Sequence, residues 1–174
     1  ITVIIKNLSD GYGDRKIIFL NLFALKKNIS IAILDDDKAI LKALTLMLSV
    51  NKQYVVSAYN HPGEILEKLN SFKPDIFISD INLPELDGIS LVRKIREIPG
   101  DHPEIIIITG NGNKEYAIEC LRLGAVDFLE KPFSMAGFRT AVERAATFVE
   151  SKRRLAELLP EKRNPLPDDG KKAV

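Results

Sequence analysis

The sequence predicts an α/β protein built as a (βα)₅ doubly wound parallel sheet, with three layers in the order α/β/α. Short apolar runs rich in β-branched residues recur across about residues 30–155, and they have the length of strands buried on both faces. Each run is followed by a longer segment whose apolar residues repeat every three or four positions, as on one face of a helix. Strands that alternate with helices form βαβ units, whose right-handed crossovers make the sheet parallel with helices on both sides.

The first half of this region contains three predicted strands and two predicted helices. Residues 31–34 form a continuous apolar run, and Asp37 is placed to cap the helix that follows. Residues 54–56 make the second strand, Pro62 suits the first turn of the second helix, and residues 75–79 make the third strand. The apolar faces of the two helices comprise Ile40, Leu41, Leu44, Met47 and Leu48, and then Ile65, Leu66 and Leu69.

The second half contains two more strands and three helices. The third helix follows Gly88, residues 105–108 make a strand of consecutive Ile, and residues 125–129 make the fifth strand. Ser134 is expected to cap a long last helix, which ends before Pro160. The apolar faces of these helices comprise Ile89, Leu91, Val92 and Ile95, then Ala117, Ile118, Leu121 and Leu123, and finally Phe138, Val142, Ala146 and Val149.

The chain divides into an unassigned N-terminal segment over residues 1–28, one domain over 29–150, and a helix extension with a flexible tail over 151–174. With a formal net charge of +1, the 174-residue chain offers no electrostatic case for direct binding to nucleic acid or to a membrane. The apolar run 17–25 is too short to span a bilayer. The single cysteine, Cys120, falls in an apolar helical pattern, so we expect it in the core of a cytoplasmic protein.

Polar residues stand where four of the predicted strands end. Asp35 and Asp36 follow the first strand, and Asp80 follows the third. Thr109 follows the fourth strand and Lys131 follows the fifth. In an open parallel α/β sheet the carboxyl ends of the strands share one edge, where ligands bind. Each feature alone has an ordinary explanation as a helix cap, a turn or a strand end. Together they place carboxylates, a hydroxyl and an ammonium at one edge.

This set of groups is suited to phosphoryl transfer to a carboxylate. An ionised Asp is a suitable nucleophile, but the neighbouring carboxylates and the incoming phosphoryl group are negative, so a divalent cation must offset them. Mg²⁺ prefers oxygen ligands and binds through one or two carboxylates together with phosphate and water. An ammonium and a hydroxyl would contact the phosphoryl oxygens. The residues therefore predict a phosphoacceptor site that depends on Mg²⁺ or Mn²⁺.

Four sequence motifs resemble the receiver domains of response regulators in two-component signalling. They occupy residues 33–37 (ILDDD), 75–88 (DIFISDINLPELDG), 108–110 (ITG) and 127–133 (DFLEKPF). The resemblance covers about residues 29–150, and the motifs stand in the right order at the right strand ends. It implies a flavodoxin-like fold with strand order 2-1-3-4-5. It also implies a signalling phosphoacceptor rather than an enzyme, whose partner is a sensor histidine kinase or a phosphotransfer protein.

The resemblance implies a role for each acidic site residue. Asp80 would be the phosphoacceptor. Asp36 and Asp80 would bind Mg²⁺ directly, and Asp35 would bind it largely through water. The backbone carbonyl of Asn82 would complete the protein ligands.

The resemblance also assigns the remaining site residues to contact and switching. Lys131 would pair with the phosphoryl group through a loop with a cis Lys131-Pro132 peptide, and Thr109 would donate a hydrogen bond to it. Thr109 would then move toward the phosphoryl group, and Phe128 would repack in the space that this leaves. Phe128 stands where the family often has Tyr, so it lacks the hydroxyl of that switch residue.

We expect a homodimer through the face formed by the fourth helix, the fifth strand and the fifth helix. The last helix would extend this contact through a rough heptad register, interrupted by Lys152, of Val142, Val149, Ala156 and Leu159. Three alternatives stay open. The chain is a pseudo-receiver that only docks partners, a flavin-binding protein of the same fold, or a DNA-binding regulator cut off before its output domain.

Overall fold

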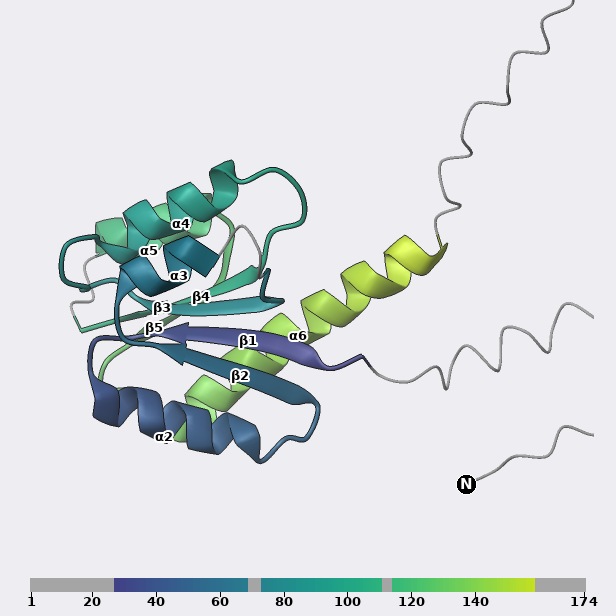
Figure 1. The fold of residues 1–174 in the computed structure, drawn as a ribbon, viewed down its shortest axis with the longest axis horizontal. Coiled ribbons are helices and arrows are strands. Elements are labelled where there is room, and N and C mark those ends of the chain that lie inside the picture. The colour runs from purple at the N-terminus through teal and green to yellow at the C-terminus, as the bar shows by residue number, and fades with distance from the viewer. Residues whose placement is uncertain (1–26, 69–72, 111–113, 159–174) are drawn as a thin grey trace, which may run out of the picture.

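A computed structural model describes residues 27–68, 73–110 and 114–158, and within them five parallel strands form one sheet in the order β2-β1-β3-β4-β5 (Figure 1). This confirms the predicted fold class and strand order. The strands are β1 (Ile29–Leu34), β2 (Tyr54–Tyr59), β3 (Ile76–Asp80), β4 (Glu104–Thr109) and β5 (Ala125–Glu130). The helices are α2 (Lys38–Ser49), α3 (Pro62–Lys68), α4 (Gly88–Glu97), α5 (Lys114–Arg122) and α6 (Met135–Leu158).

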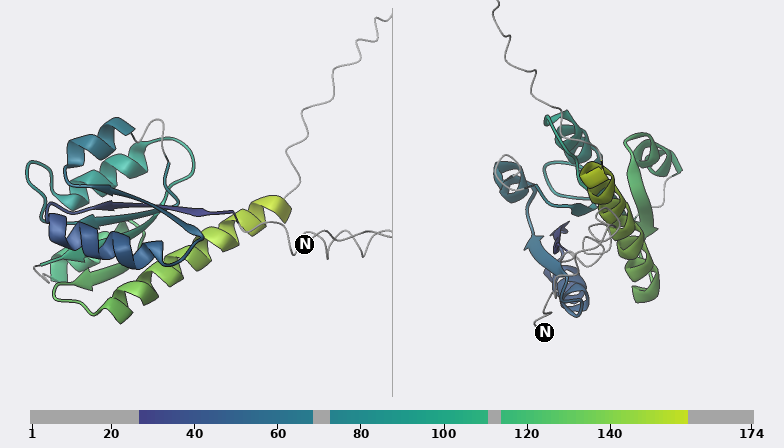
Figure 2. Two further views of the ribbon diagram at one scale, coloured as in Figure 1. Left: turned by 60° about the horizontal axis from the view of Figure 1, so that its bottom comes forward. Right: turned by 90° about the vertical axis from the view of Figure 1, so that its right-hand side faces the viewer.

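Helices cover both faces of the sheet because the strands are apolar on both faces. Alternate side chains of a strand point to opposite sides, and in β1 this sends Ile31 and Ile33 to one core and Ala32 and Leu34 to the other. The first core packs against α2 and α6, and the second packs against α3, α4 and α5. Figure 2 shows the resulting three layers from two further directions.

The predicted helix starts are confirmed. Asp37 caps α2, since its Oδ1 accepts hydrogen bonds from the backbone N–H groups of Ala39 and Ile40. Pro62 begins α3, and the hydroxyl of Ser134 accepts a hydrogen bond from the N–H of Gly137 in α6. Several strands are longer than predicted: β1 starts two residues earlier and β2 continues to Tyr59. Cys120 is buried, as expected.

The heptad interpretation of the last helix is wrong at its first two positions. Val142 and Val149 are buried in the core between α6 and the sheet, so neither is available to a second chain. The physical reason is that a core-facing helix repeats every 3.6 residues, and over one or two turns this spacing matches a heptad. Ala156 is exposed, and Leu159 lies outside the described residues.

The structure does not test the predictions for the N-terminal segment and the C-terminal tail. Residues 1–26 and 159–174 lie outside the described part of the chain, as does the predicted stop at Pro160. Among the described helices, none is both long and apolar enough to cross a membrane.

Candidate functional site

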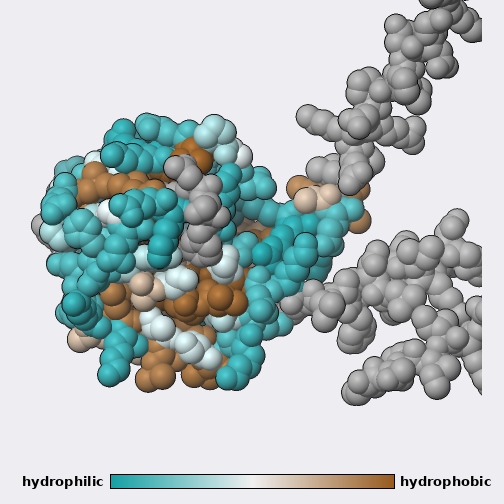
Figure 3. All heavy atoms as spheres, viewed as in Figure 1, coloured by the Kyte–Doolittle hydropathy of each residue, from teal (hydrophilic) through white to brown (hydrophobic). Residues whose placement is uncertain are grey.

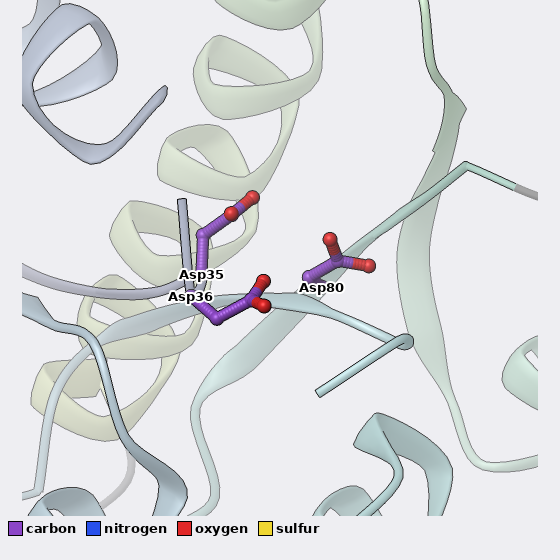
Figure 4. Close-up of side chains that lie close together, drawn as sticks. All are labelled: Asp35, Asp36 and Asp80. Carbon is purple, nitrogen blue, oxygen red and sulfur yellow. The ribbon is translucent and has the colours of Figure 1, made fainter. Parts of the chain in front are cut away.

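The sheet brings the predicted site residues to one edge, because β1, β3, β4 and β5 are parallel and end together. Asp35 follows β1 directly, and Asp80 is the last residue of β3. Thr109 is the last residue of β4, and Lys131 follows β5. Asp36 completes the acidic group from the loop after β1. Figure 4 shows the side chains of Asp35, Asp36 and Asp80 close together, with Asp35 and Asp36 side by side and Asp80 facing them from the neighbouring strand.

The three carboxylates form a candidate site for a divalent cation. One oxygen of each of Asp35, Asp36 and Asp80 lies within 4.8 Å of the others. Asp35 and Asp80 are only 1% and 4% exposed, whereas Asp36 is exposed to solvent. Carboxylate oxygens are the ligands that Mg²⁺ prefers, and an exposed third member leaves room for water and a phosphoryl group. The residues present therefore fit the predicted Mg²⁺.

Lys131 joins the two buried carboxylates. Its ammonium nitrogen lies 2.8 Å from Oδ2 of Asp35 and 2.5 Å from Oδ2 of Asp80. The N–H of Lys131 donates to the carbonyl oxygen of Thr109 at 2.7 Å, and this anchors the loop to the end of β4. The Lys131-Pro132 peptide is cis, as the resemblance implies.

Burial and ion pairing both shift the pKa values of Asp35 and Lys131, and in each group the two effects act in opposite directions. Burial raises the pKa of Asp35 above its ordinary value, and the hydrogen bond from Lys131 offsets this only in part. Burial would lower the pKa of the Lys131 ammonium, but its hydrogen bonds to Asp35 and Asp80 outweigh that effect and raise the pKa. Lys131 is more exposed than Asp35, so burial costs its charge less. The ammonium is therefore firmly charged at neutral pH.

The backbone around Asp80 is held by several hydrogen bonds. Oδ1 of Asp80 accepts a hydrogen bond from the N–H of Asn82 at 2.9 Å. The hydroxyl of Ser79 donates to the carbonyl oxygen of Asp80, also at 2.9 Å. The N–H of Gly88 donates to the carbonyl oxygen of Ile81 at 2.8 Å, which ties the start of α4 to the end of β3.

Gly88 is a site-shaping residue to which our sequence reasoning assigned no role. A Cβ atom at this position would lie 2.4 Å from the carbonyl oxygen of Asp80 and 2.8 Å from Cα of Ile81. Both neighbours are backbone atoms, so they cannot move aside as a flexible side chain would. The Asp87-Gly88 pair in the motif was the available sequence signal, but only the fold shows what Gly88 contacts.

The two predicted switch residues lie on neighbouring strands. Thr109 is fully buried, and Asp80 on the adjacent strand is paired with Ile108, the residue before Thr109. Phe128 is paired with Ile107 across β4 and β5 and is half-buried against the core that contains α3, α4 and α5. Asn82 is exposed at the rim of the site.

Comparison with known proteins identifies the class to which this fold and site belong. A family model described as the response regulator receiver domain matches residues 31–143. The transcriptional regulatory protein FixJ of Rhizobium meliloti is 31% identical over 117 residues, which cover 67% of this chain and 56% of FixJ. The DNA-binding transcriptional regulator NtrC of Proteus hauseri is 34% identical over 115 residues, which cover 66% of this chain and 24% of NtrC. The chain thus spans about half of one relative and a quarter of the other.

Solved structures agree with these sequence matches. The crystal structure of FixJ-N has a TM-score of 0.62 and 28% identity, covering 70% of this chain and 95% of that one. A CheY-like receiver domain protein from Methanospirillum hungatei JF-1 has a TM-score of 0.63 and 27% identity, covering 74% and 99%. The chain belongs to the response regulator receiver domain family. It is a receiver domain of the two-component type, the phosphorylation-switched module of such regulators.

Proposed function

We propose that Asp80 accepts a phosphoryl group from a phosphohistidine on a sensor histidine kinase or phosphotransfer protein. The observation that carries this proposal is the pairing of Lys131 with Asp35 and Asp80 beside an acidic group that fits a divalent cation. An oxygen of the Asp80 carboxylate attacks phosphorus in line, forming a P–O bond as the bond to the donor nitrogen breaks. The chain assists only its own phosphorylation and dephosphorylation, so it is a signalling phosphoacceptor and not an enzyme acting on other substrates.

Mg²⁺ (or Mn²⁺) would be held by Asp35, Asp36, Asp80 and the backbone carbonyl of Asn82. When bound, it would offset the negative charge of these carboxylates and of the incoming phosphoryl group. Lys131 is placed to exchange its contact with Asp80 for one with a phosphoryl oxygen, because it already lies within hydrogen-bond distance of the acceptor carboxylate.

The proposed switch runs from Thr109 to Phe128. The hydroxyl of Thr109 would donate to a phosphoryl oxygen, and Phe128 would fill the space that Thr109 leaves beside β4. Phe128 has no hydroxyl, so its two positions must differ in packing alone. A half-buried ring on β5, at the margin of the core that contains α3, α4 and α5, is suited to such a change.

Partners would read this change on the face formed by α5, β5 and α6. The helices of this face carry exposed apolar side chains, namely Tyr116, Ile118 and Leu121 of α5 and Met135 of α6, and exposed apolar surface favours contact with a second chain. We propose a homodimer there. The +1 net charge gives no support for direct nucleic-acid binding by this domain. We place the reaction in the cytoplasm, where the ATP that phosphorylates a kinase histidine is available.

The test is phosphorylation of the purified chain by acetyl phosphate with Mg²⁺, followed by intact mass. We expect one added phosphoryl group on the wild type, and none after EDTA treatment or in Asp80→Asn. Asp101→Asn is the matched control, since Asp101 is an exposed acid outside the site and its loss should leave the adduct intact. A folded wild-type chain that gains no phosphoryl group, and that beryllofluoride does not perturb, would contradict the proposal and leave a docking module.

A further inference from the structure

Helix α6 continues well past the core that it helps to form. Its last buried residue is Val149, yet the helix runs on to Leu158. From residue 150 onward the side chains are exposed or partly exposed, and Leu155 and Leu158 are 58% and 74% exposed. Figures 1 and 2 show these last turns projecting beyond the sheet, at the end opposite to the acidic site. Figure 3 shows apolar surface only at the tip of this projection in that view.

Polar contacts tie the projecting helix to the N-terminal ends of the strands. The guanidinium of Arg153 donates to the carbonyl oxygens of Lys27 and Asn28 at 3.2 and 3.3 Å, just before β1. It also donates to Oδ1 of Asp75 at 2.7 Å, just before β3. Four hydrogen bonds from one planar group fix the helix in direction as well as in distance.

The acceptor of this contact is itself held in place. Oδ2 of Asp75 accepts hydrogen bonds from both the N–H and the hydroxyl of Ser30, each at 2.8 Å. The N–H of Asp75 donates back to the Ser30 hydroxyl at 3.0 Å. The carboxylate is therefore positioned by β1 before Arg153 reaches it, which lowers the ordering cost of the contact.

Lys152 makes a second contact, with the first residue of β4. Its ammonium forms an ion pair with Oε1 of Glu104, whose side chain is almost fully buried. Arg96 lies in the same region and donates to the carbonyl oxygen of Pro103, the residue before Glu104. A buried carboxylate is costly without a cation beside it, so Glu104 favours the helix position that brings Lys152 close.

We propose that these contacts of Arg153 and Lys152, which we call the latch, hold the end of α6 rigidly in one direction relative to the rest of the receiver domain. The latch joins the starts of β1, β3 and β4 to a helix whose apolar packing has already ended. The direction in which the chain leaves the domain is thereby set by the sheet. The end of α6 is then held at a fixed angle to the site edge.

An isolated pair of exposed charges would not hold the helix in one direction, because such pairs contribute little to stability. The latch differs in two respects. The side chain of Arg153 is about two-thirds buried, and its guanidinium binds two backbone carbonyls as well as a carboxylate. The Glu104 partner of Lys152 is about nine-tenths buried, so salt screens this pair less than an exposed one.

Hydrogen exchange on the full chain tests the latch. In the double variant Lys152→Ala/Arg153→Ala, we expect amides of residues 152–158 to exchange about tenfold faster or more than in the wild type, and to be accelerated by a larger factor than those of β3 and β4. Arg154→Ala is the control, since Arg154 is an exposed neighbour of the same charge. Alanine is the strongest helix former, so faster exchange cannot come from lost helix propensity. Equal exchange in the double variant and the control would overturn the latch.

A spin-label distance gives a second readout. Labels at the exposed positions Lys52→Cys, in the turn before β2, and Glu157→Cys, near the end of α6, report the distance between the two elements. We expect one narrow distance distribution with the latch intact, and a broad one in the double variant. A narrow distribution in both would show that the latch is not what orients the helix. Neither measurement requires a phosphoryl group, so their failure would leave the proposed phosphorylation of Asp80 untouched.

Discussion

Lys131 and Asp80 are 51 residues apart in the chain, yet the ammonium of one lies 2.5 Å from the carboxylate of the other. The same ammonium contacts Asp35, which is 96 residues away. Three strand ends thus meet through one charged group. Among the described residues, Lys131 is the cation that forms ion pairs with both buried carboxylates of the site.

Lys131→Met should destabilise the chain by about 1–3 kcal/mol at pH 7, because it leaves two buried carboxylates without their counter-charge. Millimolar Mg²⁺ should recover part of this loss, since a cation that binds only the folded state stabilises it. Urea unfolding with and without Mg²⁺ measures both effects. The matched control is Lys73→Met, at an exposed position whose ammonium contacts only the carbonyl oxygen of Pro99 among the described residues. A Lys131→Met chain as stable as the control variant would contradict the pairing.

Gly88→Ala should cost about 2 kcal/mol or more and slow phosphorylation of Asp80. Its Cβ would overlap the carbonyl oxygen of Asp80, so either α4 or the phosphoacceptor must shift. Gly63→Ala is the control, because there the nearest atoms belong to the side chain of His61 and not to the backbone. Urea unfolding and the rate of adduct formation with acetyl phosphate give the two readouts. If both variants behave like the wild type, the close approach at Gly88 has no consequence.

The cap of α4 should depend on pH through Asp87. Burial would raise the pKa of this carboxyl, but hydrogen bonds from the hydroxyl and the N–H of Ser90 outweigh it and hold the pKa below the ordinary value of 3.8. A depressed pKa means that the charged form is favoured by folding. The resulting stability is present above pH 3.8 and is lost as the pH falls through the folded-state pKa.

The corresponding measurement compares wild type, Asp87→Asn and Asp87→Ala by urea unfolding at pH 6 and pH 3. Asp87→Ala should cost about 1 kcal/mol at pH 6 through loss of the cap. Asp87→Asn keeps a capping oxygen without the charge, so its deficit should be smaller and should shrink toward pH 3. A deficit for Asp87→Asn that grows on acidification would have the wrong sign for this account.

The thiol of Cys120 should be almost inert in the folded chain. Burial raises its pKa to about 11, and the nearby charge of Glu119 acts in the same direction. The thiolate is the reactive form, so both its rarity and its burial slow the reaction. We expect a disulfide reagent at pH 8 to modify the native chain at least ~100-fold more slowly than the chain unfolded in urea. Comparable rates would place Cys120 at the surface.

Much of the fold was predictable because its determinants are local. The apolar runs of β1 and β4, the cap at Asp37 and the first-turn Pro62 each act within a few residues, and each was placed correctly. The gathering of Asp35, Asp36, Asp80 and Lys131 was also predictable, because parallel strands bring their carboxyl ends to one edge. The error at Val142 and Val149 arose because a buried helix face and a heptad have nearly the same spacing.

The sequence by itself determined the order and type of the elements, the position of the acidic and basic groups at strand ends, and the family to which they point. Only the tertiary structure decided which face of α6 is used by the core, why residue 88 has no side chain, and how Arg153 reaches Asp75. These three depend on atoms that approach across the fold, and Arg153 and Asp75, for example, are 78 positions apart. Local periodicity carries no information about such distances, because they are set by how the layers pack.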